Sequence, residues 1–370
     1  MAAGMGIGRF YYTPALPGMM EGLGLSAAEA GWIASINYVG YLVGAIGAAY
    51  GWAQGREYGL ALLGVGGSAV LAGLMATTDS LAAFLLIRFL AGIASAFMLV
   101  FLGTVIFDRL AASDRNDLQA LHFGGVGLGI ASSALLAGIL SQFHAGWQAG
   151  WIGAALLSAL AFGVVLLLVP RGPAATAAPV REPPLPSTRA MRQMTLAYGL
   201  FGFGYVITAT FLIAIVRAGE GGVQFESAVW LVAGIAIFVS TWFWNATGAR
   251  FGLVRAYALA MLVEAVGVVA SVAMGGYAGP LIAAALLGGT FVAATAVGLQ
   301  VGRRMAQRSP RRALALMTAA FGFGQIVGPI FAGYVADITG SFFVPSIGAA
   351  AFLLVSAALA LDAGRRAGMR

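Results

Sequence analysis

"RGPAATAAPVREPPLPSTRAMR", residues 171–192, divides this chain of 370 residues into two parts of similar length. Its proline and alanine content, with scattered charges, is typical of an extended and flexible linker. Apolar stretches of about 20 residues, the length that a helix needs to cross a bilayer, stand on both sides of it. We expect six spans before and six after the linker, at about 1–20, 29–50, 58–77, 81–107, 119–141, 147–169, 193–216, 227–247, 253–274, 279–301, 313–336 and 343–362.

The composition requires a membrane. Hydrophobic residues make up 61% of the chain and charged residues only 9%, against roughly 25% charged residues in soluble domains. We therefore predict an all-α integral membrane protein with two six-helix bundles, residues 1–170 and 193–370, joined by a cytoplasmic linker at 171–192. The sequence contains no cysteine, which excludes disulfides and thiolate metal sites. We expect neither a metal nor a cofactor.

The arginines predict the topology. The formal net charge is +7, but the basic residues concentrate in alternate loops and in the C-terminal tail, as a topology signal does, rather than marking a nucleic-acid surface. Because basic loops stay in the cytoplasm, we predict a multi-pass protein of the bacterial inner membrane with both termini inside. The arginines on this side are Arg56, Arg109, Arg115, Arg171, Arg181, Arg189, Arg192, Arg250, Arg255, Arg303, Arg304, Arg308, Arg311, Arg312, Arg365, Arg366 and Arg370.

The remaining three arginines are different. Arg217 lies in an opposite loop, whereas Arg9 and Arg88 lie inside spans. Only eight residues precede Arg9, about 12 Å of helix. We therefore expect the first helix to lack part of its cytoplasmic end.

Several motifs resemble those of the major facilitator superfamily. "LLIRFLAGIASA" (85–96) on the fourth span resembles its R-x-x-x-G motif, and "GFGQIVGPIFAG" (322–333) on the eleventh resembles its G-x-x-x-G-P motif. "GARFGLVR" (248–255) resembles a degenerate form of the loop motif G-x-x-x-D-R-x-G-R-R, with Ala249 where the acid is expected. "GIGRFYYTP" and "GVGLGIASS" (125–133) resemble the uncharacterised YbfB/YjiJ-type branch. The small-residue spacings in these stretches predict close helix packing.

The resemblance implies a secondary transporter that works by alternating access, with two bundles moving about a central site. Spans 1, 4, 7 and 10 line the cavity in that superfamily. Arg9 and Arg88 fall on two of these four spans. We expect proton-coupled symport or antiport of a small molecule by a monomer in contact with membrane lipid.

Both intramembrane arginines are costly, by about 2.5–3.5 kcal/mol on insertion scales. Each can therefore contact substrate, take part in coupling, or tie its helix to backbone carbonyls of a neighbour. Spans 1, 4, 7 and 10 contribute these two cations and no deep carboxylate, so the cavity should attract a carboxylate or phosphate, which a guanidinium binds through two parallel hydrogen bonds. We therefore expect a small organic anion, in a pocket to which Tyr11, Tyr12 and Thr13 also contribute.

Further polar residues inside spans complete the candidate site. Asn37 and Tyr41 share one helix face, and Tyr198 and Tyr205 share another with Gly202 between them. Gln325 precedes Pro329 and favours hydrogen bonds to the carbonyls that a proline releases. The full predicted set for substrate is Arg9, Tyr12, Asn37, Tyr41, Arg88, Tyr205 and Gln325, and the candidates for coupling are Arg88 and Glu264, the only carboxylate deep in a span.

Other function classes fit less well. A membrane enzyme needs paired acids, a Ser–His arrangement or a metal cluster, and the two histidines, His122 and His144, lie near opposite ends of one span. A sensor usually carries a large extramembrane domain, and ATP-driven transport needs a phosphate-binding loop, which is missing from the sequence. An exporter of neutral or cationic compounds remains an alternative to the organic-anion transporter.

Overall fold

The computed structural model describes residues 1–48, 52–115, 118–169, 182–219 and 221–369, and these residues form helices without a strand. Residues 171–181 of the predicted linker, with Arg171 and Arg181, and Arg370 lie outside the described residues. The helices of the first half are η1 (Ala2–Ile7), α1 (Tyr12–Leu23), α2 (Ala27–Ala48), α3 (Glu57–Met75), α4 (Leu81–Phe97), η2 (Met98–Leu102), α5 (Gly103–Ala112), α6 (Gln119–Gln142) and α7 (Trp147–Leu168). Those of the second half are α8 (Arg189–Arg217), α9 (Gly222–Phe251), α10 (Leu253–Ala273), α11 (Ala278–Met305), α12 (Pro310–Thr339) and α13 (Phe343–Arg366).

Eleven helices in the described ranges are long and apolar enough to cross a membrane, counting the continuous run Leu81–Ala112 (α4, η2 and α5) as one. The broken helix η1–α1 precedes them as the first span. Their bounds lie within a few residues of the predicted spans. The prediction of an all-α membrane fold is therefore confirmed, while the domain boundaries at residues 170 and 193 stay a prediction.

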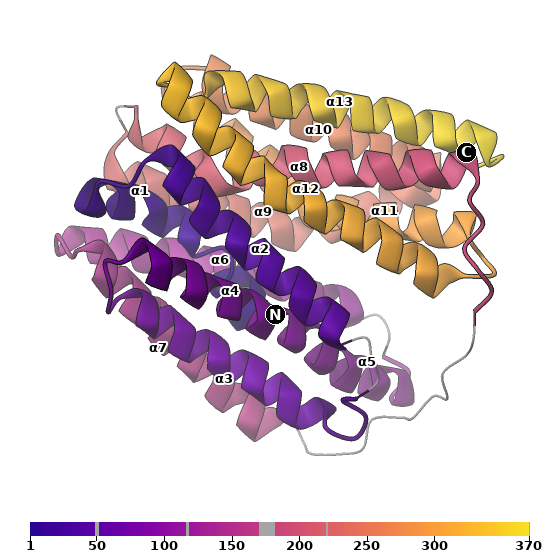
Figure 1. The fold of residues 1–370 in the computed structure, drawn as a ribbon, viewed down its shortest axis with the longest axis horizontal. Coiled ribbons are helices and arrows are strands. Elements are labelled where there is room, and N and C mark those ends of the chain that lie inside the picture. Colours follow the sequence, from indigo (N-terminus) through magenta and orange to yellow (C-terminus); the bar gives the residue numbers. More distant parts are fainter. Residues whose placement is uncertain (49–51, 116–117, 170–181, 220, 370) are drawn as a thin grey trace.

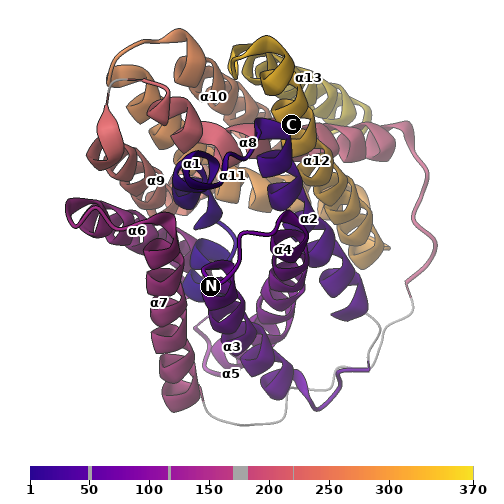
Figure 2. The same ribbon diagram turned by 60° about the vertical axis from the view of Figure 1, so that its left-hand side comes forward.

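The two halves lie side by side (Figure 1), with α1 to α7 in indigo and magenta and α8 to α13 in pink to yellow. Residues 182–188 and the end of α13 mark one end of the molecule, which we name the linker end. The loops at 24–26, 77–80, 143–146, 274–277 and 340–342 lie at the opposite end, which we name the far end. Between the halves, α2 packs against α12, α6 against α9 and α1 against α8, and Figure 2 shows these helices along the boundary of the two halves.

Glycines set how closely the helices of each half pack. A Cβ at Gly92, in the R-x-x-x-G motif, would overlap the backbone of Asn37 on α2, and one at Gly324 would overlap the backbone of Gly199 on α8. Between the halves, a Cβ at Gly31 would overlap the Pro329 carbonyl of α12. The predicted role of the small-residue spacings in close helix packing is confirmed.

The first span is broken in the middle. Its opening residues form the π-helix η1, residues 8–11 form turns, and α1 begins only at Tyr12. Pro14 contributes to the break because it has no N–H to donate to the preceding turn. Met1 lies against Gly125 of α6, whereas α6 begins at Gln119 and α5 continues to Ala112. Met1 therefore lies inside the bundle, short of the linker end.

Candidate functional site

Arg9 occupies the interface between the two halves. Its side chain is 5% exposed, and its guanidinium carbon lies 4.5 Å from the ring centre of Tyr38 and 4.6 Å from that of Tyr41. These tyrosines are three residues apart on α2, so both rings face the broken first span. Contact with two aromatic rings offsets part of the cost of burying the cation.

The second half supplies the hydrogen-bond partner of Arg9. Arg9 Nη2 donates to Gln325 Oε1 of α12 over 3.0 Å, and Gln325 Nε2 donates to the Tyr205 hydroxyl of α8. Gln325 was expected to bond carbonyls released by Pro329, and this expectation is wrong, because both ends of its amide are engaged by side chains. One amide thus connects the cation of the first half to a phenol of the second.

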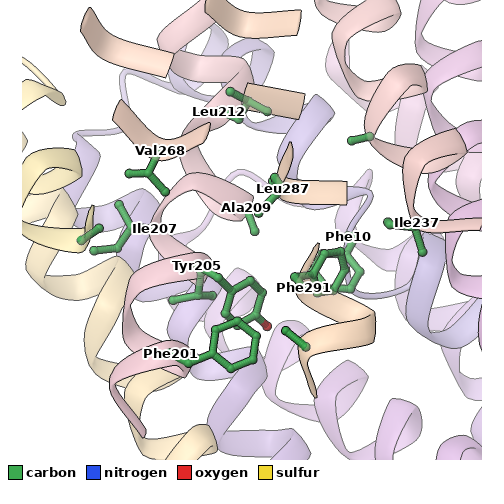
Figure 3. Close-up of a cluster of buried hydrophobic side chains, with 14 of the residues drawn as sticks. Phe10, Phe201, Tyr205, Ile207, Ala209, Leu212, Ile237, Val268, Leu287 and Phe291 are labelled. Atoms are coloured by element: carbon green, nitrogen blue, oxygen red, sulfur yellow. The ribbon is translucent and has the colours of Figure 1, made fainter. Parts of the chain in front are cut away.

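Tyr205 is held by a stack of aromatic rings. Its ring is within 8° of parallel to Phe291 and to Phe321, at centroid distances of 5.4 and 5.5 Å. Phe10, next to Arg9, packs edge-on against Phe291 at 5.6 Å. Figure 3 shows Phe10 and Phe291 in contact beside Tyr205. Phe10 and Tyr205 are buried, whereas Tyr41 and Phe321 are partly exposed.

Arg88 donates hydrogen bonds to the backbone of the first span. Its Nη1 donates to the carbonyl of Gly8 over 3.0 Å and its Nη2 to the carbonyl of Arg9 over 3.2 Å. These carbonyls belong to the break between η1 and α1, where the regular helical ladder is interrupted. Its guanidinium also lies 5.1 Å from the ring centre of Tyr12. Of the alternatives that the sequence left open, the contacts of Arg88 match the tie to backbone carbonyls.

The other predicted residues join helices around Arg9. The Asn37 side chain donates to the carbonyl of Arg88 over 2.9 Å, and the Tyr12 hydroxyl donates to the carbonyl of Ala30 over 2.9 Å. Thr13 donates to the carbonyl of Ala209, across the halves, over 2.6 Å. Tyr198 donates to the carbonyl of Thr295. Of the predicted set, the structure therefore brings together Arg9, Tyr41, Tyr205 and Gln325, a cluster that we name the centre.

The centre has positive charge without a counter-charge. Neither Arg9 nor Arg88 forms an ion pair with a carboxylate in the described part of the chain. The Nε–H groups of Arg9 and Arg88 are buried and have no hydrogen-bond partner among the described residues. A buried donor without a partner loses about 1–3 kcal/mol. An acceptor placed beside Arg9 would satisfy its free donor and balance its charge.

Toward the far end, polar groups join the halves. The Asp337 carboxylate of α12 accepts hydrogen bonds from the amides of Ala27 and Ala28 at the start of α2, each 2.9 Å long. Arg217, at the end of α8, pairs with Glu21 of α1 at 2.8 Å and also with Glu226 of α9. The two halves are thus tied together between the centre and the far end.

Sequence reasoning missed several residues of this arrangement. Tyr38, Phe291 and Phe321 have no polar signal that separates them from core aromatics, and their role follows from contact with Arg9 and Tyr205. Asp337 lies at the end of a span, where an acid is unremarkable until its partner on α2 is known. A motif search finds single residues, whereas these contacts join distant segments.

The chain and its fold are similar to those of transporters. Over residues 1–361 the chain matches the family described as uncharacterised MFS-type transporter YbfB. No curated protein matches the chain. The fold is similar to that of the nucleoside transporter NupG, with a TM-score of 0.75, 16% identity, and 98% and 97% of the two chains covered. It is also similar to a bacterial homolog of the human lysosomal transporter Spinster, inward-facing and unoccupied, with a TM-score of 0.70, 15% identity, and 98% and 95% of the two chains covered.

Proposed function

Since this chain belongs to the family described as uncharacterised MFS-type transporter YbfB, we propose that it moves a small organic anion across the bacterial inner membrane by alternating access. The observation that carries the proposal is Arg9, a buried guanidinium at the interface of the halves with no carboxylate partner among the described residues and a free Nε–H. An anionic group beside Arg9 receives charge-assisted hydrogen bonds, which are about twice as strong as neutral ones.

The neighbours of Arg9 have different roles in the two halves. Tyr38 and Tyr41 hold its guanidinium from α2, and Arg88 holds the backbone at Gly8 and Arg9. Gln325 and Tyr205 belong to the second half, so the hydrogen bond between Arg9 and Gln325 forms and breaks as the halves move. A substrate that engages Arg9 and Gln325 together therefore changes the stability of one conformation relative to the other.

The orientation is part of the proposal. Fourteen arginines lie at the linker end among the described residues, and they favour a cytoplasmic position for that end. With the linker end inside, the ties through Asp337 and Arg217 close the site to the outside. The partial exposure of Tyr41 and Phe321, on the linker side of Arg9, fits a site approached from the cytoplasm.

The test begins with the purified protein in lipid nanodiscs. A thermal-shift panel of monocarboxylates, dicarboxylates, organic phosphates, organic cations and nucleosides identifies the ligand class, and the stabilising compound is then followed in proteoliposomes. We expect stabilisation by one or more anions. Stabilisation by a cation or a nucleoside with none by any anion would overturn the proposal.

Variants of Arg9 locate the binding. Arg9→Gln removes the charge and should weaken anion affinity by about 10- to 100-fold, corresponding to the 1.5–3 kcal/mol of a hydrogen bond to a charged group. Arg9→Lys keeps the charge but loses the paired geometry and should lose less. The matched control is Arg56→Gln, an exposed arginine at the linker end, which should bind as the wild type does. Unchanged anion transport by Arg9→Gln would refute the assignment.

A further inference from the structure

A second polar group is buried outside the centre built around Arg9. Glu264 lies near the middle of α10 and is 0% exposed. Neither oxygen of its carboxyl group has a hydrogen-bond partner among the described residues. None of the contacts described above uses this residue, so its presence at this depth requires a separate explanation.

The helices packed against α10 offer Glu264 no cation at its depth within the described ranges. The arginines of α8, α9, α11 and α13 lie at the ends of these helices, at positions 189, 192, 217, 250, 303, 304, 365 and 366. The acids Glu226 of α9 and Asp362 of α13 also lie near helix ends. Arg255 lies in the first turn of α10 itself. The titratable groups away from the helix ends are the phenols Tyr198 and Tyr205 of α8 and Tyr257 of α10. An ionised carboxylate without a partner here would be very costly.

Burial without a partner fits a protonated acid. A neutral carboxyl group costs far less to bury than a carboxylate, which needs an ion pair or hydrogen bonds to balance its charge. The described residues supply neither to Glu264. We therefore expect Glu264 to carry a proton in this conformation.

Tyr205 connects this acid to the centre. Glu264 is on α10, which packs against α8, the helix of Tyr205. The Tyr205 hydroxyl accepts from Gln325, which in turn accepts from Arg9. If Glu264 loses its proton, its negative charge opposes the binding of an anion at Arg9. If it holds a proton, this opposition is absent.

We propose that Glu264 is the proton-binding site of the transport cycle and that a proton and the substrate anion bind together and move in the same direction. The proton adds to a carboxylate oxygen of Glu264 from one side of the membrane and leaves from the same oxygen to the other side, with no other bond changed. Ionisation of Glu264 destabilises the far-end-closed conformation, because the charge is left in a dry helix interface. This inference rests on the proposed function for its anion, but the protonation of Glu264 can be measured without any anion.

Infrared difference spectroscopy of the protein in nanodiscs uses the proton itself as the probe. We expect the wild type at neutral pH to show the carbonyl band of a buried protonated carboxyl group, and Glu264→Gln to lack it. Asp79→Asn, which alters an exposed acid in the loop between α3 and α4, should retain the band. A wild type without the band, or a Glu264→Gln variant that keeps it, would overturn the proposal.

A distance measurement reports on the coupling. Spin labels at Ala145→Cys and Ala278→Cys, two exposed far-end positions in different halves, can be attached selectively because the chain has no native cysteine. We expect alkaline pH to lengthen the distance in the wild type but not in Glu264→Gln. Glu264→Met, apolar and of similar length, serves as a second non-titrating variant if glutamine impairs folding. The same pH response in these variants as in the wild type would refute the coupling role, whereas failure of the anion panel alone would refute only the proposed substrate class.

Discussion

Asp337 provides a direct test of how the far end is closed. The first turn of α2 has a local cap, because the Ser26 hydroxyl accepts from the amide of Glu29 and the Glu29 carboxylate accepts from the amide of Ser26. The two amides between them, at Ala27 and Ala28, are bonded by Asp337 of α12. Asp337 thus caps a helix of the other half, and this cap exists only while the far end is closed.

The expected change in the ratio of open to closed far end follows from the known cost of losing a helix cap. Replacing a capping aspartate by alanine costs about 1 kcal/mol, whereas asparagine caps nearly as well as aspartate. Because Asp337 is exposed and water can hydrate the freed groups, we take the central capping value rather than that of a buried charge. Asp337→Ala should therefore shift the ratio of open to closed far end about fivefold toward the open state. Asp337 uses one oxygen for each of the two amides, whereas Asp337→Asn keeps a single accepting oxygen, so asparagine should shift the ratio less than alanine does.

Pulsed electron paramagnetic resonance on labels at Ala145→Cys and Ala278→Cys measures this ratio as the weights of a short and a long distance. The control is Asp79→Asn, which changes an acid at the same end within one half. A distribution that Asp337→Ala leaves unchanged, or that Asp337→Asn shifts as much as alanine does, would contradict the capping argument.

Two further predictions concern stability and orientation. Arg88→Leu should lower the melting temperature of the purified protein, because it leaves the carbonyls of Gly8 and Arg9 buried without their donors at about 1–3 kcal/mol each; a melting temperature lowered no more by Arg88→Leu than by Arg9→Gln would argue against this role. Reporter fusions after residues 185 and 366 should report cytoplasm, and those near residues 145 and 277 the outside; a C-terminus on the outer side would reverse the proposed orientation.

Much of this protein follows from its sequence. Hydrophobic stretches of span length determine the helices and their number, since a helix that satisfies its own backbone is the local solution to an apolar environment. The depth of Arg9, Arg88 and Glu264 could be counted along the chain, and the cost of burying a charge marked them for attention. The glycines of the R-x-x-x-G and G-x-x-x-G-P motifs likewise indicated close packing before any partner was known.

Only the tertiary structure decided which of these groups meet. The motif that contains Gln325 indicated a local role beside Pro329, but the amide reaches Arg9, 316 positions away in the chain. The start of α2 shows the same division: Ser26 and Glu29 cap the helix from three residues apart, whereas its other two amides depend on Asp337, 310 and 309 positions away. Local hydrogen bonds are set by spacing along the chain. Contacts between the halves are set by how two bundles pack, which no single segment encodes.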